Sequence, residues 1–157
     1  MAHPGSFDPR NALSKGRLQK IFAVVRAFVA QADGSLLFAR LKVGCPEIAK
    51  SRQGTDLKSL RSFMHVGHLR GTICAWPGVE QFAKGDYEGY LTGLLLHEFG
   101  HLGSDGGERD ADRWIFENFG IRIHYKGELD VEWVDEFALR RIVAHAKKRG
   151  AVNFRHS

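Results

Sequence analysis

The sequence of 157 residues lacks several features that would place it in a class of proteins at once. It has two cysteines, Cys45 and Cys74, which are too few for a disulfide scaffold, and we expect both to be free thiols. It has no uninterrupted run of about 18 apolar residues, so we expect no membrane-spanning helix. Residues 1–10 lack the apolar segment of a secretory signal, and the chain contains neither internal repeats nor low-complexity segments. These absences favour a cytoplasmic protein without a membrane partner.

The composition is sufficient for one hydrophobic core. The apolar fraction is 43% and the aromatic fraction 11%, so we expect a single domain over residues 13–157, preceded by a flexible tail over residues 1–12. The net charge of +5 includes a dense basic run at residues 147–149, which we interpret as a solvated helix end. No basic face with interleaved aromatic residues is evident, so a nucleic-acid partner is not expected.

Hydrophobic periodicity predicts helices mixed with short strands. The helices expected from apolar residues at helical spacing cover residues 14–31, 55–64, 86–102, 108–118 and 130–143. The strands expected from strand-like stretches cover residues 35–41, 68–76 and 121–125. The predicted fold class is therefore α+β.

Glycines mark two features of the central predicted helix, residues 86–102. Gly89 and Gly93 lie four residues apart, so one face of this helix is flat and can pack closely against a neighbour. Three glycines between residues 103 and 107 then end the helix and allow the chain to turn back. The next helix, which begins near Glu108, would return along the first.

The residues with the clearest chemical meaning are His97, Glu98 and His101. Two histidines four residues apart lie on one face of a helix, where their imidazoles can hold one zinc ion. Glu98 lies beside them and can take a proton from a zinc-bound water molecule. This spacing predicts a zinc-dependent hydrolase.

Such a site needs a third protein ligand, and the downstream candidates are Asp105, Glu108, Asp110 and Asp112. Along a continuous helix Asp105 would lie about 12 Å from His97, because each residue adds about 1.5 Å. Ligand atoms around zinc are only about 3–3.5 Å apart, so the chain must turn back. Glu108 is the first carboxylate after the turn. Asp112 lies one helical turn further on the same face, where it can accept the outer ring N–H of a liganding histidine.

The two segments His97-Glu-Phe-Gly-His101 and Glu108-Arg-Asp-Ala-Asp112-Arg-Trp114 together resemble the gluzincin metallopeptidases. Within that group they are most similar to the small ImmA/IrrE-type peptidases. In those proteins an HExxH helix is followed by a helix with the pattern Glu-x-Glu-Ala-Asn/Asp-x-Phe/Trp. The resemblance covers residues 94–119, and outside them only the order of elements matches.

The resemblance implies a zincin-like single domain in which a small, mostly antiparallel sheet packs on the HExxH helix. It implies a zinc metalloendopeptidase that hydrolyses peptide bonds in a protein substrate by means of a water activated by Glu98. By analogy alone, the substrate would be a separate protein such as a transcriptional repressor. The implied site residues are His97, His101 and Glu108 as zinc ligands, Glu98 as general base, and Asp112 as the residue that orients a liganding histidine.

The spacing departs from the gluzincin pattern in one respect. Only six residues separate His101 from Glu108, fewer than in many gluzincins, so Asp105 stays open as an alternative ligand. The metzincin pattern is excluded, because it requires a histidine at the position of Gly107.

The groups that would contact a substrate are less well defined by the sequence. His124 and Tyr125, on the strand predicted after the carboxylate helix, are candidates for the donor that stabilises the oxyanion. The backbone of the strand at residues 71–76 is a candidate to pair with an extended substrate. Two other functions stay open, a zincin-fold binding or regulatory module without catalysis and a nucleic-acid-associated protein.

Overall fold

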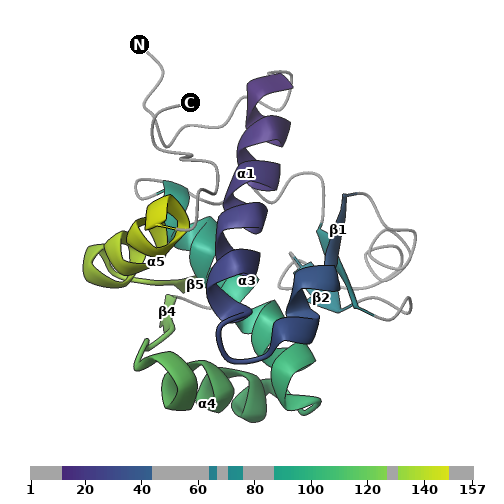
Figure 1. Ribbon diagram of the computed structural model, residues 1–157, viewed down its shortest axis with the longest axis vertical. Helices are drawn as coiled ribbons and strands as arrows, with labels where there is room; N and C mark the ends of the chain where they lie inside the picture. Colours follow the sequence, from purple (N-terminus) through teal and green to yellow (C-terminus); the bar gives the residue numbers. More distant parts are fainter. Residues whose placement is uncertain (1–11, 44–63, 67–70, 76–86, 127–130, 149–157) are drawn as a thin grey trace.

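A computed structural model describes residues 12–43, 64–66, 71–75, 87–126 and 131–148. Helix α3 lies in the middle, with α1 beside it, α5 on the left, α4 at the bottom and a small sheet on the right (Figure 1). The helices are α1 (Ala12–Val29), α3 (Tyr87–Ser104), α4 (Glu108–Phe119) and α5 (Glu136–Lys148), and η1 (Gly34–Phe38) is a 3-10 helix. The predicted helices over residues 14–31, 86–102 and 108–118 are thus confirmed to within two residues at each end.

The strands form two small sheets. They are β1 (Arg40–Val43), β2 (Met64–Val66), β3 (Thr72–Ala75), β4 (His124–Lys126) and β5 (Val131–Trp133). The first sheet has the order β1-β3-β2, with β1 parallel and β2 antiparallel to β3, and β4 pairs antiparallel with β5. The predicted α+β class is confirmed, and two of these three pairings are antiparallel. Whether the topology is that of a zincin stays a prediction.

The position of β3 contradicts the expectation that residues 71–76 pair with a substrate. Strand β3 is hydrogen-bonded to β1 on one side and to β2 on the other, so both of its edges are occupied. All four of its residues are buried. The edge strands of this sheet are β1 and β2.

The core fills the space between α1, α3 and α5. Helix α1 contributes an apolar stripe at the predicted helical spacing, and Phe22 of this stripe stacks on Phe99 of α3 with ring centroids 5.4 Å apart. The buried residues of the stripe are Leu18, Ile21, Phe22, Val24, Val25, Phe28 and Val29. The predicted tail, residues 1–12, lies outside the described residues except for Ala12.

Two glycines allow other elements to approach the backbone of α3. A Cβ atom added at Gly93 would lie 2.5 Å from Trp133 Cα, and one added at Gly100 would lie 2.3 Å from the carbonyl oxygen of Ala111. These distances leave no room for a side chain, so β5 lies directly on α3 at Gly93 and α4 at Gly100. The flat face predicted at Gly89 and Gly93 is confirmed at Gly93, and the Gly89 carbonyl accepts a hydrogen bond from the Val134 amide at 3.2 Å.

Gly100→Ala is expected to lower the free energy of unfolding by about 1–3 kcal/mol, because α4 must move away from α3. Gly16→Ala in α1 is the matched control. Its Cβ atom would meet nothing within 4 Å, so alanine should raise stability by about 0.5–1 kcal/mol. Urea unfolding of both variants measures the difference. Equal stability of the two would contradict the close contact between α3 and α4.

Two predicted elements differ from the structure, and in each case an aspartate side chain caps a helix whose start was not predicted at that position. Residues 35–41, predicted as a strand, form η1 and the start of β1, and the Asp33 carboxylate accepts hydrogen bonds from the Ser35 amide and hydroxyl at 3.0 and 2.7 Å. The last helix, predicted from Asp130, begins only at Glu136, where Asp135 accepts the Ala138 amide at 2.9 Å.

The other two differences concern short elements. Of the helix predicted over residues 55–64 only Met64 is described, and it lies in β2. Within the predicted strand over residues 121–125, pairing begins only at His124, although Ile121 and Ile123 are buried.

The expectation of two free thiols was wrong, because Cys74 of β3 is disulfide-bonded. The chain has one other cysteine, Cys45, which lies outside the described residues. Disulfides are typical of oxidising compartments, so the cytoplasmic location stays a prediction. In the described part of the chain, every helix is too short or too polar to cross a membrane.

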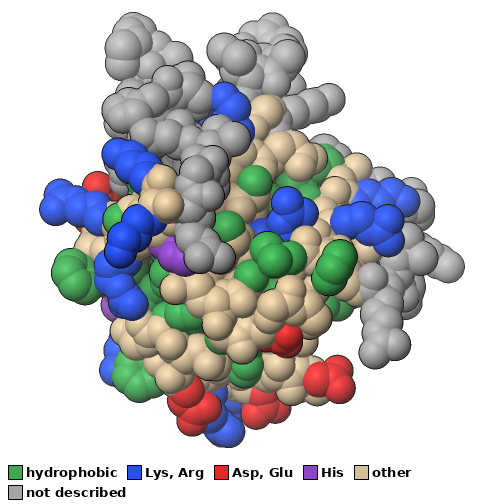
Figure 2. All heavy atoms as spheres, viewed as in Figure 1, with side chains coloured by type: hydrophobic (Ala, Val, Ile, Leu, Met, Phe, Trp, Pro, Cys, Tyr) green, Lys and Arg blue, Asp and Glu red, His purple; other side chains and the backbone are tan. Residues whose placement is uncertain are grey.

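Most acidic side chains on the face shown in Figure 2 lie near its lower end, where α4 lies, whereas Lys and Arg side chains are spread over the rest of that face, including the side where α5 lies. Lys147 and Lys148 are exposed in the last turn of α5, where cations interact favourably with the helix dipole. For these two residues this agrees with the interpretation of the basic run as a solvated helix end, and Arg149 lies outside the described residues.

Candidate metal centre

Helix α3 presents two imidazole rings on the same face, one turn apart. The Nε2 atoms of His97 and His101 lie 3.2 Å from each other. His97 and Glu98 are buried, whereas His101 is partly exposed. One ligand atom from each of these three residues lies within 4.8 Å of the others, so the group could hold a metal ion.

The glycine-rich reversal predicted after His101 is present. Helix α3 ends at Ser104, and Asp105 adopts a left-handed conformation with φ 53°, which aspartate tolerates better than most residues. The Asp105 amide donates to the His101 carbonyl at 2.9 Å, and α4 begins three residues later at Glu108. The chain therefore turns back within a few residues and carries a carboxylate helix past the two histidines.

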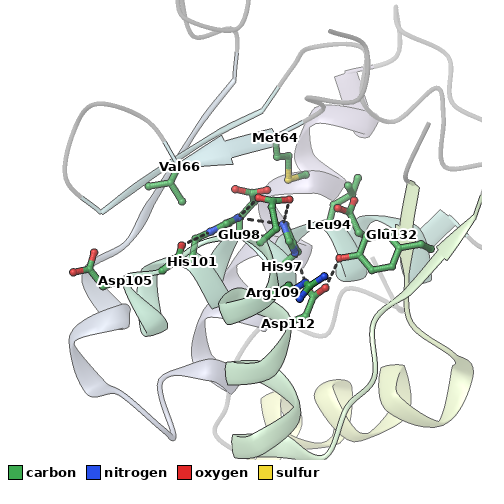
Figure 3. Close-up of a pocket in the computed structure, with 13 residues that line it drawn as sticks. Met64, Val66, Leu94, His97, Glu98, His101, Asp105, Arg109, Asp112 and Glu132 are labelled. Atoms are coloured by element: carbon green, nitrogen blue, oxygen red, sulfur yellow. Dashed lines mark hydrogen bonds and ion pairs between the residues drawn. The ribbon is translucent and has the colours of Figure 1, made fainter. Parts of the chain in front are cut away.

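Glu108 is the carboxylate that this turn brings to the imidazole pair. Its Oε2 lies 3.1 Å from His97 Nε2, and its Oε1 lies 2.8 Å from His101 Nε2. The side chain of Asp105 points away from the histidines at the far side of the cavity (Figure 3). The geometry thus favours Glu108 over Asp105 as the third ligand.

The outer nitrogen of each ring has its own acceptor. His97 Nδ1 donates to Asp112 Oδ1 at 2.8 Å, and His101 Nδ1 donates to the Gly106 carbonyl at 2.9 Å. With the outer nitrogens acting as donors, each neutral ring leaves its Nε2 lone pair directed at the space between them. Asp112 therefore has the position expected of a residue that orients a liganding histidine.

The distances among these donor atoms are slightly shorter than those around zinc, so only small side-chain movements would admit the ion. The three pairs formed by His97 Nε2, His101 Nε2 and the Glu108 carboxylate are separated by 2.8–3.2 Å. Tetrahedral zinc bonds of about 2.0–2.2 Å separate the ligand atoms by about 3.3 Å. Two imidazoles and one carboxylate are also a ligand set that suits zinc, so these residues fit such an ion.

Burial and negative charge shift the pKa values of the two buried groups. Burial lowers the pKa of His97, but the hydrogen bond that His97 donates to Asp112 and the charges of Glu98, Glu132 and Asp112 outweigh this effect and raise the pKa to about 9. Burial also raises the pKa of Glu98 well above its usual value, although the charge of His97 opposes this shift. A buried carboxylate with a raised pKa is suited to accept a proton from water.

A metal ion must displace the proton that His97 holds at neutral pH, so binding of zinc at pH 7.5 should release at least about one proton. The apparent affinity should increase with pH up to about 9 and then level off. Because the pKa of His97 is raised above 6.5, protonated His97 stabilises the metal-free protein below pH 6.5, and this contribution is lost as the pH rises through about 9.

Titration calorimetry in buffers with different ionisation enthalpies measures the number of protons released. An observed enthalpy that is the same in every buffer at pH 7.5 would contradict the raised pKa of His97.

The imidazole pair lies at an open cavity of about 940 Å³ between α3, α4, β2 and the β4–β5 hairpin. Met64 and Val66 of β2 line one side of it and Glu132 of β5 the other (Figure 3). Tyr125, predicted as a candidate oxyanion donor, also lines the cavity. His124, the other candidate, does not belong to the described lining.

Tyr125 and His124, the two candidate oxyanion donors, have different surroundings. Tyr125 donates its hydroxyl hydrogen to Asp112, and burial and this hydrogen bond raise the pKa of its phenol well above 10. His124 instead packs against Trp133, with ring centroids 4.4 Å apart and the ring planes tilted by 31°, and its Nε2 lies 4.0 Å from Asp135. The structure therefore brings Tyr125, and not His124, to the candidate metal centre.

Sequence reasoning missed Glu132, which is buried at the cavity wall with a pKa raised by burial to about 7. It precedes Trp133 and Val134 in a segment predicted as helix. The available signal was an isolated carboxylate within a short run of β-branched and aromatic residues, which is typical of a strand. Arg109, Met64 and Val66 at the cavity were missed as well.

The chain matches no protein-family model, and no curated protein and no solved structure shows significant similarity to it. The resemblance to gluzincins therefore rests on the residues of α3 and α4. The structure shows a group formed by His97, Glu98 and His101, at HExxH spacing, that could hold a metal ion.

Proposed function

We propose that this protein is a zinc-dependent metallopeptidase. The observation that carries the proposal is the convergence of His97 Nε2, His101 Nε2 and the Glu108 carboxylate within 2.8–3.2 Å of one another, with buried Glu98 beside them. A large open cavity gives this group access to a substrate. A purely structural cluster of charges would need neither the cavity nor the fixed orientation of both rings.

His97, His101 and Glu108 would hold the ion and leave a coordination position for water or substrate. When bound, zinc supplies Lewis-acid chemistry, which acidifies water and polarises a carbonyl group. Glu98 accepts the proton of the attacking water as a general base and then donates it to the leaving amine. Tyr125 keeps its hydroxyl hydrogen at neutral pH and donates it to Asp112 in this structure. It is the candidate donor to the oxygen of the scissile carbonyl, a role in which its hydroxyl would exchange Asp112 for the substrate.

Strand β2 is the element with a backbone suited to an extended substrate. It is one of the two outer strands of its sheet, and β3 is its strand partner in the described part of the chain. Met64 and Val66 of this strand line the cavity, so a peptide beside β2 would lie next to the zinc ligands.

The test is peptide hydrolysis by the purified, zinc-loaded protein. A complex peptide mixture is incubated with it, and new peptide termini are identified by mass spectrometry. We expect new termini with the zinc-loaded protein, none after a chelator removes the metal, and their return when zinc is restored. The proposal fails if the fully zinc-loaded protein cleaves no peptide, or if cleavage continues in the chelator.

A further inference from the structure

The carboxylate of Glu132 has no role in the mechanism described above. Glu132 is only 8% exposed, and its side chain extends from β5 toward the same cavity as His97 and Glu98 (Figure 3). Within the described residues it forms no ion pair with a lysine or an arginine. The charge of His97 favours the ionised form of Glu132 in the metal-free protein, but a His97 that holds a metal ion is neutral. A buried carboxylate is costly when no cationic side chain lies beside it, so the place of Glu132 at the cavity wall indicates an external partner in the metal-loaded protein.

The fold holds Glu132 at this place. Strand β5 lies against α3 because Gly93 has no side chain, and a Cβ atom there would lie 2.5 Å from Trp133 Cα, in the residue that follows Glu132. The Val134 amide also donates to the Gly89 carbonyl at 3.2 Å. The carboxylate is therefore carried by a fixed strand next to the metal ligands and not by a loose surface side chain.

The cavity has an excess of negative charge, although the chain as a whole has a net charge of +5. The described residues that line it include five carboxyl groups and one guanidinium, which carry a net charge of −4 if every carboxyl group is ionised and the histidines are neutral. A divalent ion at the metal centre would reduce this excess to two. The raised pKa values of Glu98 and Glu132 make this excess smaller at neutral pH. The charged lining residues are Glu98, Asp105, Glu108, Asp112, Glu132 and Arg109.

We propose that Glu132 binds a cationic nitrogen of the substrate, an ammonium group that enters the cavity beside the scissile peptide bond. This inference rests on the proposed peptidase function and names its substrate class, peptides with a free amine close to the cleavage site. The amine is either the amino terminus of the peptide or a lysine side chain, and both offer the same ion pair to a buried carboxylate.

Three peptide libraries of the same sequences distinguish these sources. In the first all amines are free, in the second only the α-amine is acetylated, and in the third lysine side chains are acetylated as well. Each library is passed over immobilised, zinc-loaded Glu98→Gln protein, which binds without cleaving, and the retained peptides are counted by mass spectrometry. Each library is also digested with the wild-type protein.

We expect the fully acetylated library to be retained and cleaved at least about tenfold less than the library with free amines. If the second library is retained like the first, the bound amine is the lysine side chain, and if it is retained like the third, the bound amine is the amino terminus. If retention depended only on the net charge of +5, the acetylated libraries would be retained more strongly than the library with free amines, since acetylation makes peptides more acidic. Adding Glu132→Gln should remove the preference, whereas adding Glu117→Gln, on the exposed surface of α4, should preserve it.

Equal retention of the three libraries, or no retention of any, overturns the inference. If the wild-type protein still cleaves all three equally, the proposed function stands and only the amine preference is wrong. If the free-amine library is preferred in binding but nothing is cleaved, the amine site stands and the peptidase function is wrong. Because the libraries are compared on unaltered Glu132, this result does not depend on whether Glu132→Gln folds.

Discussion

Replacing Glu98 by glutamine is expected to lower the rate of peptide hydrolysis by about 10²–10⁴-fold while zinc remains bound. Glutamine has nearly the size of glutamate, so the buried site keeps its packing, but an amide cannot accept a proton from the attacking water. The buried position and raised pKa of Glu98 make it the described carboxylate best suited to this role. Metal content is measured on the same preparation, so loss of activity is not confused with loss of zinc.

The matched control is Glu117→Gln, which removes one carboxylate from the exposed face of α4, outside the cavity lining. It should hydrolyse peptides at the wild-type rate. Undiminished hydrolysis by Glu98→Gln would show that Glu98 is not the general base. If a biological effect of the protein persists in Glu98→Gln without any hydrolysis, the protein is a binding or regulatory module that uses the same fold.

The second large effect is expected from His101→Ala, which should lose stoichiometric zinc. This variant removes one of the three donor groups and leaves the Glu108 carboxylate with a single imidazole. Its loss of affinity should exceed the roughly 10–100-fold cost of losing an outer hydrogen-bond partner of a ligand. Elemental analysis of the wild-type protein and the variant, purified side by side, measures the zinc content of each.

His124→Ala is the control variant, because it also removes one histidine from the chain but leaves the imidazole pair intact. His124 lies on β4 against Trp133, away from the imidazole pair, so this variant should keep one zinc ion per chain. Equal zinc content in His101→Ala and in the wild-type protein would show that the ion, if any, binds elsewhere.

The parts of the candidate site that could be predicted depend on local geometry. His97 and His101 share a face because a helix repeats every 3.6 residues, and Glu98 must then lie beside them. The reversal before Glu108 was expected from three glycines, but Gly103 still lies within α3 and the left-handed residue of the turn is Asp105. The position of Asp112 one turn after Glu108 follows from the same helical repeat.

The parts that could not be predicted depend on contacts between segments far apart in the sequence. Residues 130–143 have apolar residues at helical spacing, and only packing against Gly93 shows that the first of them form a strand. The burial of Glu132 at the cavity follows from that packing. The backbone at residues 71–76 was expected to pair with a substrate, but in the folded sheet β3 is paired with both β1 and β2.

By itself, the sequence determined the α+β class, the pair of imidazoles, the neighbouring carboxylate and the turn that brings back a second helix. These features depend on the helical repeat and on glycine, which act over a few residues. The tertiary structure decided that Glu108 rather than Asp105 faces the histidines, that Tyr125 rather than His124 lies at the cavity, and that Glu132 is buried beside them. The physical reason is that each of these outcomes depends on how closely α4 and β5 approach α3, which is set by contacts at Gly100 and Gly93.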